Sequence, residues 1–193
     1  MDNKLFLNLG CGELPIKDCV NVDIKPMKHI DKVVDLSKLS WPWPDSSVDG
    51  IYMIHSLEHF INPLEIINEC HRILKPGGFL YLQVPHSSLV TGIGNIQHYR
   101  TFSIELGSLI NGKFEEVLKE IRWWGYPRNR KHPYVTFTVE NKASSHPIIY
   151  MFLIRPISFI IQSLINLNPN LFERIWCYYV GGADEVVYKG IKI

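Results

Sequence analysis

The chain has 193 residues, 46% of them apolar and 20% charged, which is typical of one globular domain with a sizeable core. The formal net charge of +1, from 20 basic and 19 acidic residues, argues against binding to duplex nucleic acid. The four cysteines lack the paired spacing of a zinc site, so no metal is expected. No basic and apolar leader opens the chain, which predicts reduced thiols and a cytoplasmic location.

The first predicted element is a strand over residues 4–9, which runs directly into Gly10 and Gly12. Glycine backbone can adopt unusual φ values and lets a ligand approach closely. A second short strand over 21–24 carries Asp23, whose carboxylate can accept hydrogen bonds from both hydroxyls of a ribose. A strand, a glycine turn, a strand and an acid form the front half of a nucleotide-binding α/β unit.

The spacing of these residues separates two classes of nucleotide. A dinucleotide fingerprint requires a third glycine and an acid about 20 residues further on. Pro15 stands at the third glycine position, and Asp23 follows Gly12 by only eleven residues. So short a connection has room for a helical turn or two, and not for a full helix over a pyrophosphate. The pattern therefore opposes a nicotinamide cofactor and favours a phosphate-free ligand such as S-adenosylmethionine.

Two more strands are predicted before the middle of the chain. Residues 31–35 form a short third strand that ends on an acid. Residues 48–54 form a mostly apolar strand of the kind found inside parallel sheets. Between these two strands, the two Trp-Pro pairs in residues 37–47 exclude a helix.

A helix is predicted to begin at Asn62, with Pro63 at its first position and Glu65 three residues after the cap. Its apolar residues recur at helical spacing on one side, so it should lie on the sheet. A lysine, a proline and two glycines at 75–78 are expected to end it.

The second half of the chain contains fewer clear signals. A strand over 79–84 stops at a proline, residues 87–96 form a loop, and a helix is expected over 103–109. Residues 114–124 are interpreted as a strand or as a passage from helix to strand. Residues 184–193 alternate in polarity, which predicts a final strand.

Residues 148–167 are strongly apolar and near the length of a membrane span. Arg155 and Pro156 interrupt this run, and Gln162 and Asn166 follow. We expect a buried or interfacial pair of helices here. A face for peripheral contact with a membrane surface or a partner protein, and a true span, are the alternatives.

Five motifs occur in an order and at a spacing that resemble one known family. They are Leu-Asn-Leu-Gly-Cys-Gly (7–12), Val-Asp-Ile (22–24), Trp-Pro-Trp-Pro-Asp-Ser-Ser-Val-Asp (41–49), Leu-Glu-His (57–59) and Arg-Ile-Leu-Lys-Pro-Gly-Gly (72–78). Together they are similar to the class I S-adenosylmethionine-dependent methyltransferases, in the small stand-alone, type 11-like branch with a shortened first helix. The match covers residues 4–105.

The resemblance implies a Rossmann-like, doubly wound α/β fold with a mostly parallel, seven-stranded sheet and an antiparallel last strand. Residues 184–193 suit that last strand, in a single methyltransferase domain over 1–193. Residues 125–183 would then be an insertion within the domain, at the place where substrate-specific structure is usual in the family.

The resemblance also implies which residues contact the cofactor. The glycine turn would hold the methionine part of the cofactor, and the acid of the second strand would bind the ribose. The end of the third strand would contact the adenine, and the end of the fourth strand would face the sulfonium. Asn8 stands where the family more often has Asp, so it supplies no charge to the ammonium, and Glu13 is an alternative. The implied cofactor-binding residues are Asn8, Gly10, Cys11, Gly12, Asp23, Ile24, Asp35, Leu36, Met53 and His55.

Methyl transfer is an in-line displacement from a positively charged sulfur, so positioning and the exclusion of water are the main tasks. A base is needed only where the acceptor must lose a proton. His98 and His86 are the candidate catalytic residues, because each follows a predicted strand or loop at the edge of the expected pocket. Glu58 and His59 either belong to the site or organise the start of the helix that follows.

These features predict a methyltransferase that uses S-adenosylmethionine and acts on a small-molecule or glycan-type acceptor. The alternative from another class is a protein that binds S-adenosylmethionine without transferring its methyl group. Such a protein would serve as a partner or as a membrane-surface accessory through residues 148–167.

Overall fold

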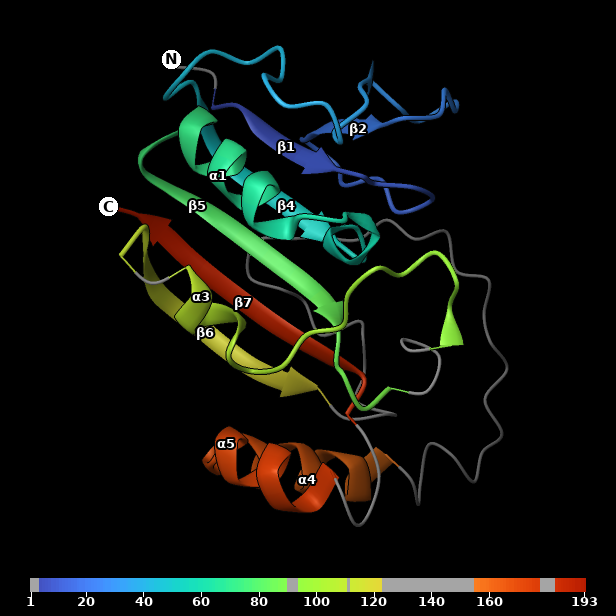
Figure 1. Cartoon of the computed structure of the whole chain (residues 1–193), viewed down its shortest axis with the longest axis vertical. Coiled ribbons are helices and arrows are strands. Elements are labelled where there is room, and N and C mark those ends of the chain that lie inside the picture. The colour runs from blue at the N-terminus through green and yellow to red at the C-terminus, as the bar shows by residue number, and fades with distance from the viewer. Residues whose placement is uncertain (1–3, 90–93, 111, 123–154, 178–182) are drawn as a thin grey trace.

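The computed structural model describes residues 4–89, 94–110, 112–122, 155–177 and 183–193. At its centre is a seven-stranded sheet with the strand order β3-β2-β1-β4-β5-β7-β6 (Figure 1). The strands are β1 (Phe6–Leu9), β2 (Val20–Asp23), β3 (Lys32–Val33), β4 (Val48–Ile54), β5 (Leu74–Pro85), β6 (Phe114–Arg122) and β7 (Glu185–Lys192).

One described strand runs against the others. β7 pairs antiparallel with both β5 and β6, and the remaining pairings of the described strands are parallel. Its pairing with β5 is in register from Phe79↔Ile191 to Pro85↔Glu185. The predicted seven-stranded, mostly parallel sheet with an antiparallel last strand is therefore confirmed.

The connection between β1 and β2 is short, as the spacing predicts, and the structure places only turns in it. The buried Asn8 amide donates to the Leu14 carbonyl oxygen and to the Asn21 side-chain oxygen, each at 2.9 Å. The Asn21 oxygen also accepts from the Ile16 N–H at 2.8 Å. The side chain of Asn8 therefore holds this connection closed, and the shortened first helix is reduced to turns.

Helix α1 (Pro63–Ile73) begins where the sequence predicts, with Asn62 at the N-cap, although the Asn62 side chain makes no capping hydrogen bond. The helix ends without a separate loop, because Leu74 already pairs with Val48 in the sheet. The glycines at 77 and 78 were expected to end the helix and lie within β5 instead. They accompany a shift in the β4–β5 register, which lets the chain turn from helix to strand.

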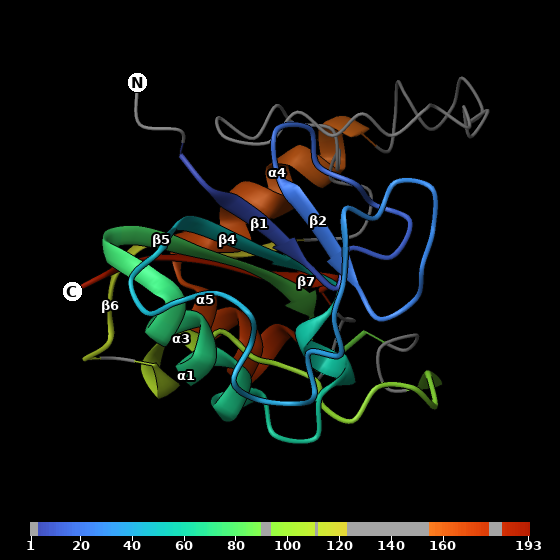
Figure 2. The same ribbon diagram turned by 90° about the horizontal axis from the view of Figure 1, so that it is seen from above.

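The two faces of the sheet carry separate apolar clusters. Side chains of β4 alternate between them: Ile51 and Met53 belong to the larger cluster, and Tyr52 and Ile54 to the smaller. The larger cluster includes buried residues of α1 and of α3 (Leu106–Leu109), and Figure 2 shows both helices on the same face of the sheet. α3 covers only the end of the helix predicted over 103–109.

Beyond the β6 end of the sheet lie α4 (Arg155–Leu167), α5 (Pro169–Leu171) and the π-helical turn η3 (Phe172–Trp176) (Figure 1). The Ile121 carbonyl oxygen on β6 accepts from the Gln162 amide at 2.5 Å and from the Asn166 amide at 2.9 Å. The polar residues that follow the break in the apolar run thus attach α4 to the sheet. The break at Arg155 marks the start of α4, and residues 148–154 lie outside the described residues, as do 123–124 of the predicted strand.

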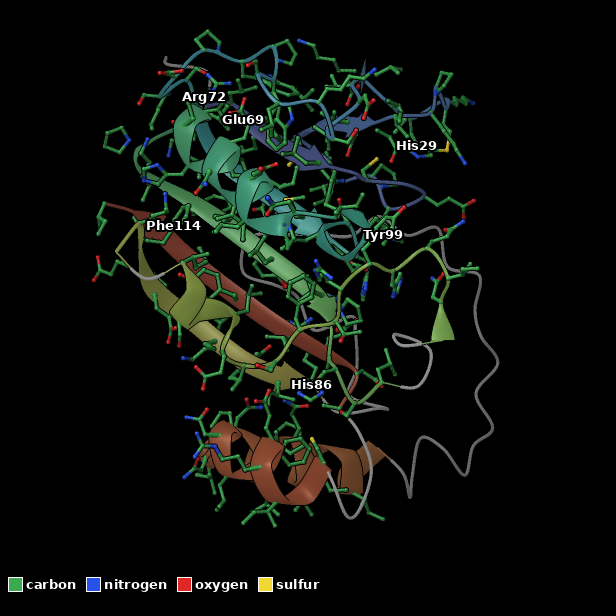
Figure 3. The ribbon with its side chains drawn as sticks, viewed as in Figure 1. His29, Glu69, Arg72, His86, Tyr99 and Phe114 are labelled. Atoms are coloured by element: carbon green, nitrogen blue, oxygen red, sulfur yellow. The ribbon has the colours of Figure 1, made fainter. Side chains whose placement is uncertain are left out.

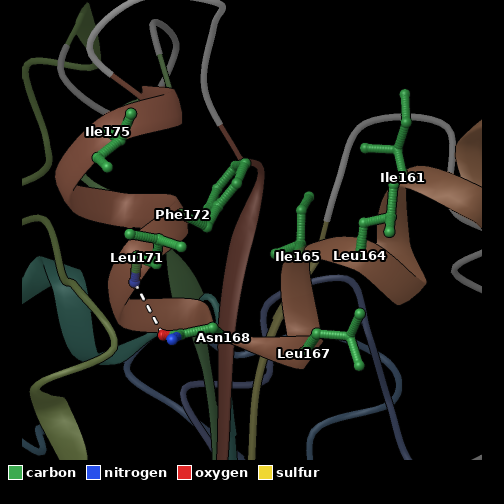
Figure 4. Close-up of a pocket in the computed structure, with 8 residues that line it drawn as sticks. All are labelled: Ile161, Leu164, Ile165, Leu167, Asn168, Leu171, Phe172 and Ile175. Atoms are coloured by element: carbon green, nitrogen blue, oxygen red, sulfur yellow. Dashed lines mark hydrogen bonds between the residues drawn. The ribbon is translucent and has the colours of Figure 1, made fainter.

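No helix in the described part of the chain is long and apolar enough to cross a membrane. α4 nevertheless exposes Phe159, Ile160 and Leu164 by 51%, 59% and 61%. Together with α5 and η3 it borders an apolar pocket (Figure 4). The pocket is lined by Ile161, Leu164, Ile165, Leu167, Asn168, Leu171, Phe172 and Ile175.

Candidate cofactor and acceptor site

The carboxyl ends of β1, β2 and β4 meet at one edge of the sheet, and Asp23 lies at this edge. One of its carboxylate oxygens accepts from the Gly12 N–H at 2.9 Å, and the other from the Lys25 N–H at 3.1 Å. Because each carboxylate oxygen can accept two hydrogen bonds, Asp23 keeps capacity for the hydroxyls of a ligand. The predicted ribose acid therefore lies directly against the predicted glycine turn.

The two glycines of this turn have left-handed backbone, with φ of +66° at Gly10 and +50° at Gly12. A Cβ at Gly10 would lie 2.1 Å from the Ser56 Oγ, so packing against the segment after β4 requires glycine there. A Cβ at Gly12 would meet no atom within 4 Å. Packing thus accounts for Gly10, whereas at Gly12 only the left-handed backbone favours glycine, and the space on its Cβ side is empty.

Cys11, between the two glycines, is buried, and its N–H donates to the Val22 carbonyl oxygen at 3.0 Å. Burial, with the negative charges of Asp23 and Asp31, raises the pKa of the Cys11 thiol to about 12. The thiol is therefore protonated at neutral pH and is no nucleophile. Cys11 contributes packing and its backbone to this edge of the sheet.

On the predicted adenine side, Asp35 and Leu36 follow β3, which is shorter than the strand predicted over 31–35. Asp35 accepts from the Ser37 N–H at 3.1 Å and from the Ser37 hydroxyl at 2.6 Å. The hydrogen bond from the Ser37 hydroxyl holds the pKa of the Asp35 carboxyl below its usual value. Asp35 thus caps a turn, the Leu36 side chain is buried in the core, and Ile24 is 58% exposed.

Met53 and His55 end β4 but place their side chains differently. Met53 is fully buried, with its sulfur 3.9 Å from the Cys70 Sγ, so its side chain packs in the core and is not presented to a ligand. His55 has a left-handed backbone, with φ of +50°, and its side chain lies against Glu185 on β7. The two residues therefore do not present side chains to one common site.

The His55 ring lies between two carboxylates. Its Nε2 is 2.8 Å from the Glu185 Oε1, and its Nδ1 is 3.6 Å from the Glu58 Oε1. Burial lowers the pKa of His55, but the two carboxylates outweigh it and raise the pKa to about 9. His55 is thus a cation at neutral pH that links the end of β4 to the start of β7.

His86 follows β5 and lies between the end of that strand and the α4–η3 segment (Figure 3). Its Nε2 is 2.9 Å from the Glu173 Oε1, and its Nδ1 is 2.6 Å from the Ser88 Oγ. The Ser88 N–H donates to the same Nδ1 at 3.1 Å, so Nδ1 holds the lone pair and Nε2–H donates to Glu173. A pocket of about 410 Å³ lies beside this chain of hydrogen bonds, lined by His86, Ser87, Ser88, Ser103, Glu173, Arg174 and Cys177.

His98, the other candidate base, lies beside Glu58 and His59 of the short helix η1 (Leu57–His59). The Tyr99 N–H donates to the Glu58 carbonyl oxygen at 2.9 Å, which fixes the two segments together. One atom from each of the side chains of Glu58, His59 and His98 lies within 4.8 Å of the other two. Sequence reasoning missed this cluster because 40 residues separate Glu58 from His98, and only the Glu-His pair gave a signal.

Comparisons with known proteins agree with this geometry. A family model described as a methyltransferase domain matches residues 6–140. A curated protein of Mycolicibacterium smegmatis, named "Probable S-adenosylmethionine-dependent methyltransferase", is 36% identical over 45 residues. That stretch is 23% of this chain and 18% of the relative, so the match spans less than one fifth of the relative's length.

Two solved structures show the likeness of fold. A methyltransferase from Archaeoglobus fulgidus described as dependent on S-adenosylmethionine has a TM-score of 0.59 at 16% identity, over 99% of this chain and 87% of its own. The 1,6-didemethyltoxoflavin-N1-methyltransferase of Burkholderia thailandensis has a TM-score of 0.51 at 16% identity, over 97% of this chain and 70% of its own. At these identities the likeness concerns the fold.

The family model covers more than half of the chain, so the chain belongs to the methyltransferase domain family. The Mycolicibacterium smegmatis relative and the Archaeoglobus fulgidus structure are both described as dependent on S-adenosylmethionine. The described edge of the sheet fits such a cofactor, because Asp23 retains acceptor capacity and no protein atom lies within 4 Å of the Cβ position at Gly12.

Proposed function

We propose that this methyltransferase acts on a small-molecule or glycan-type acceptor bound in the pocket beside His86. The observation that carries the proposal is the hydrogen-bonded chain of Ser88, His86 and Glu173 in the pocket wall. A volume of about 410 Å³ lies in the usual range for small-molecule sites, about 300–1,000 Å³. The Burkholderia thailandensis neighbour was crystallised with 1,6-didemethyltoxoflavin and S-adenosylhomocysteine, which supports this class of acceptor by analogy of fold.

The proposal assigns the cofactor to the carboxyl edge of β1, β2 and β4. Asp23 binds the ribose hydroxyls, and the backbone of the turn at 10–12 contacts the methionine part. Ile24 packs on the adenine, and Asp35 with the Leu36 N–H borders its polar edge. The end of β4, at Met53 and His55, is assigned to the side of the sulfonium. Asn8 contributes by holding the turn in place, because its amide hydrogens are donated to the β1–β2 connection.

The bound cofactor supplies an electrophilic methyl group on a positively charged sulfur. Held by Asp23 and the turn at 10–12, it would supply that methyl group to an oxygen or nitrogen of the acceptor, with the sulfur as the leaving group. The chain's own residues hold the acceptor in line and take up its proton. The acceptor's proton passes to the Ser88 Oγ while the Ser88 proton moves to the His86 Nδ1. Glu173 then stabilises the resulting imidazolium through Nε2–H.

Two measurements test this function in sequence. Calorimetry with S-adenosylmethionine, its demethylated product and NAD should show binding of the first two and not of NAD. Incubation of the enzyme and radiolabelled S-adenosylmethionine with fractionated cell extract should place the label in the small-molecule or glycan fraction. Label that enters only protein or nucleic acid would contradict the proposal.

Once an acceptor is purified, His86→Gln should lower kcat by about 10²–10⁴-fold and leave the affinity for S-adenosylmethionine unchanged. His71→Gln is the matched control, because His71 lies on α1, where its ring packs edge-on against Phe114. An unchanged kcat in His86→Gln would remove His86 from the reaction. His98 is the other predicted base and is tested by the same substitution.

A second function is supported by the apolar surface of α4, η3 and the pocket between them. In this alternative, the protein binds S-adenosylmethionine without transferring its methyl group, and acts as a partner or membrane-surface accessory through the part of 148–167 that the structure describes. Sedimentation with lipid vesicles, together with cofactor binding but no transfer to any fraction, would favour it. Residues 125–183 carry the substrate-specific or accessory role in both cases.

A further inference from the structure

We propose that Glu58, His59 and His98 bind a divalent transition-metal ion. Their side chains offer one carboxylate oxygen and two imidazole nitrogens, all within 4.8 Å of one another. Two histidines and one carboxylate are a donor set that proteins use for Zn²⁺ and Fe²⁺ where coordination positions stay open. Mg²⁺ and Ca²⁺ prefer oxygen ligands, so the donor set favours the borderline transition metals.

Glu58 is the residue on which the proposal mainly depends. Its side chain is 0% exposed, and neither carboxylate oxygen accepts a hydrogen bond from the described residues. Burying a carboxylate without such bonds is costly. His55 gives partial compensation, but its Nδ1 is 3.6 Å away, beyond hydrogen-bond length, and its Nε2 is bonded to Glu185. A metal ion supplies the direct bond that the Glu58 oxygens lack.

His59 is oriented for ligation. Its Nδ1 lies 3.0 Å from the Gln97 carbonyl oxygen. A carbonyl oxygen only accepts, so Nδ1 carries the hydrogen and Nε2 holds the lone pair that a metal requires. Histidines that bind metals commonly donate their other N–H to a carbonyl or carboxylate in this way, which fixes the tautomer and the ring.

His98 reaches the same place from a different segment. Its ring lies 4.9 Å from the His59 ring, centroid to centroid, with an angle of 76° between the planes. The Tyr99 and Arg100 N–H groups both donate to the Glu58 carbonyl oxygen, at 2.9 and 3.4 Å. The backbone therefore fixes the second histidine to η1 before any ion binds, so most of the ordering cost is already met by the fold.

An ion with three protein ligands has positions left for water or for an oxygen of the acceptor. Coordination lowers the pKa of a bound hydroxyl, which would help an acceptor hydroxyl lose its proton. This second step rests on the proposed function. The metal site itself does not, because it can be measured without any acceptor.

The test uses the full chain after dialysis against a chelator. Calorimetric titration with Zn²⁺, and absorption spectroscopy with Co²⁺ as a coloured substitute, should show one ion per chain. Glu58→Gln and His98→Gln should each weaken Zn²⁺ binding by at least about 100-fold and change the Co²⁺ spectrum. His71→Gln, the same substitution on α1, should bind like the wild type.

An absence of Zn²⁺ and Co²⁺ binding in the wild type would overturn the proposal, and so would equal binding by the wild type, Glu58→Gln and His98→Gln. Because Glu58 is buried, circular dichroism must show that Glu58→Gln folds. If it does not, His59→Gln decides, since His59 is exposed at the surface. Calorimetry with S-adenosylmethionine on the same samples keeps the two proposals distinguishable: cofactor binding without metal binding overturns only the metal site.

Discussion

The Asp23 carboxylate accepts a hydrogen bond from the Gly12 N–H at 2.9 Å, so the acid of β2 and the turn after β1 form one structural unit. The same carboxylate also accepts from the Lys25 N–H. In the proposed site the Asp23 carboxylate therefore has two roles: it holds the turn after β1, and it binds the ribose. A substitution at Asp23 must be designed to separate them.

Asp23→Ala should weaken S-adenosylmethionine binding by about 1–3 kcal/mol, because the ribose hydroxyls lose their acceptor. Asp23→Asn keeps one side-chain oxygen for the Gly12 N–H, so its affinity for the cofactor should fall less than that of Asp23→Ala. Calorimetry gives the affinities, and urea unfolding of both variants reports the loss of the turn contact. If Asp23→Ala binds the cofactor as tightly as the wild type, Asp23 is not in the site.

Gly10→Ala should destabilise the fold by about 1–3 kcal/mol, because its Cβ would collide with the Ser56 Oγ and the backbone is left-handed. The double variant Gly10→Ala with Ser56→Gly should recover part of that loss by removing the colliding atom. Gly12→Ala is the comparison, since its Cβ would meet open space within the protein. Gly12→Ala should therefore incur only the cost of the left-handed backbone and destabilise the fold less than Gly10→Ala does. Equal unfolding temperatures for Gly10→Ala and the wild type would refute the collision.

Glu69 on α1 joins the Trp-Pro loop to the helix. It binds Arg72 through two hydrogen bonds, at 2.6 and 2.9 Å, and accepts from the Trp41 N–H at 2.8 Å. The Arg72 guanidinium holds the pKa of Glu69 below its usual 4.5. The ionised Glu69 carboxylate therefore contributes fully to stability above pH 4.5. This contribution is lost as the pH falls through the lower pKa that Glu69 has in the folded state.

Accordingly, Glu69→Gln should lower the free energy of unfolding by about 1.5–3 kcal/mol at neutral pH. The difference from the wild type should narrow as the pH falls below 4.5, because the wild-type carboxylate then gains its proton. Urea unfolding at a series of pH values measures this. A difference that stays constant over the whole series would show that the charge on Glu69 is not the cause.

All four thiols are free, and burial raises the pKa of each of them, to about 12 at Cys11 and about 11 at Cys19. The folded protein should therefore react slowly with iodoacetamide at mildly alkaline pH, with the fully buried Cys70 slowest. In urea all four should be alkylated rapidly. Mass spectrometry of the labelled peptides gives the order, and fast labelling of native Cys11 would contradict the burial of the turn.

The first half of the fold was predictable because its signals are local. The strand ending at Leu9, the glycine turn and Asp23 lie within a few residues of one another, and Asn62 with Pro63 is a start signal for a helix. Alternation of polar and apolar residues was enough to indicate the last strand. Each of these patterns depends on the period of one element and not on its neighbours.

The contacts at the candidate sites were not predictable, because they join residues that are distant in the chain. His86 meets Glu173, and His55 meets Glu185, across 87 and 130 residues. These pairs depend on how elements that are distant in the chain pack together, which no local pattern encodes. The turn that Asp35 caps is local, because Ser37 is two residues away, whereas the use of the Asn8 amide within the β1–β2 connection is evident only from the packing.

β7 comes later in the chain than both strands that it joins, and among the described strands β6 pairs with β7 alone. During synthesis on the ribosome, β6 therefore emerges before β7. Until β7 is made, β6 has no described strand to pair with, and an unpaired strand is prone to association with other chains. The sheet is complete only when residues 185–192 pair with both β5 and β6. The same step brings Glu185 to His55 as its counter-ion. A polypeptide cut short before that segment would lose two strands of the sheet and not one.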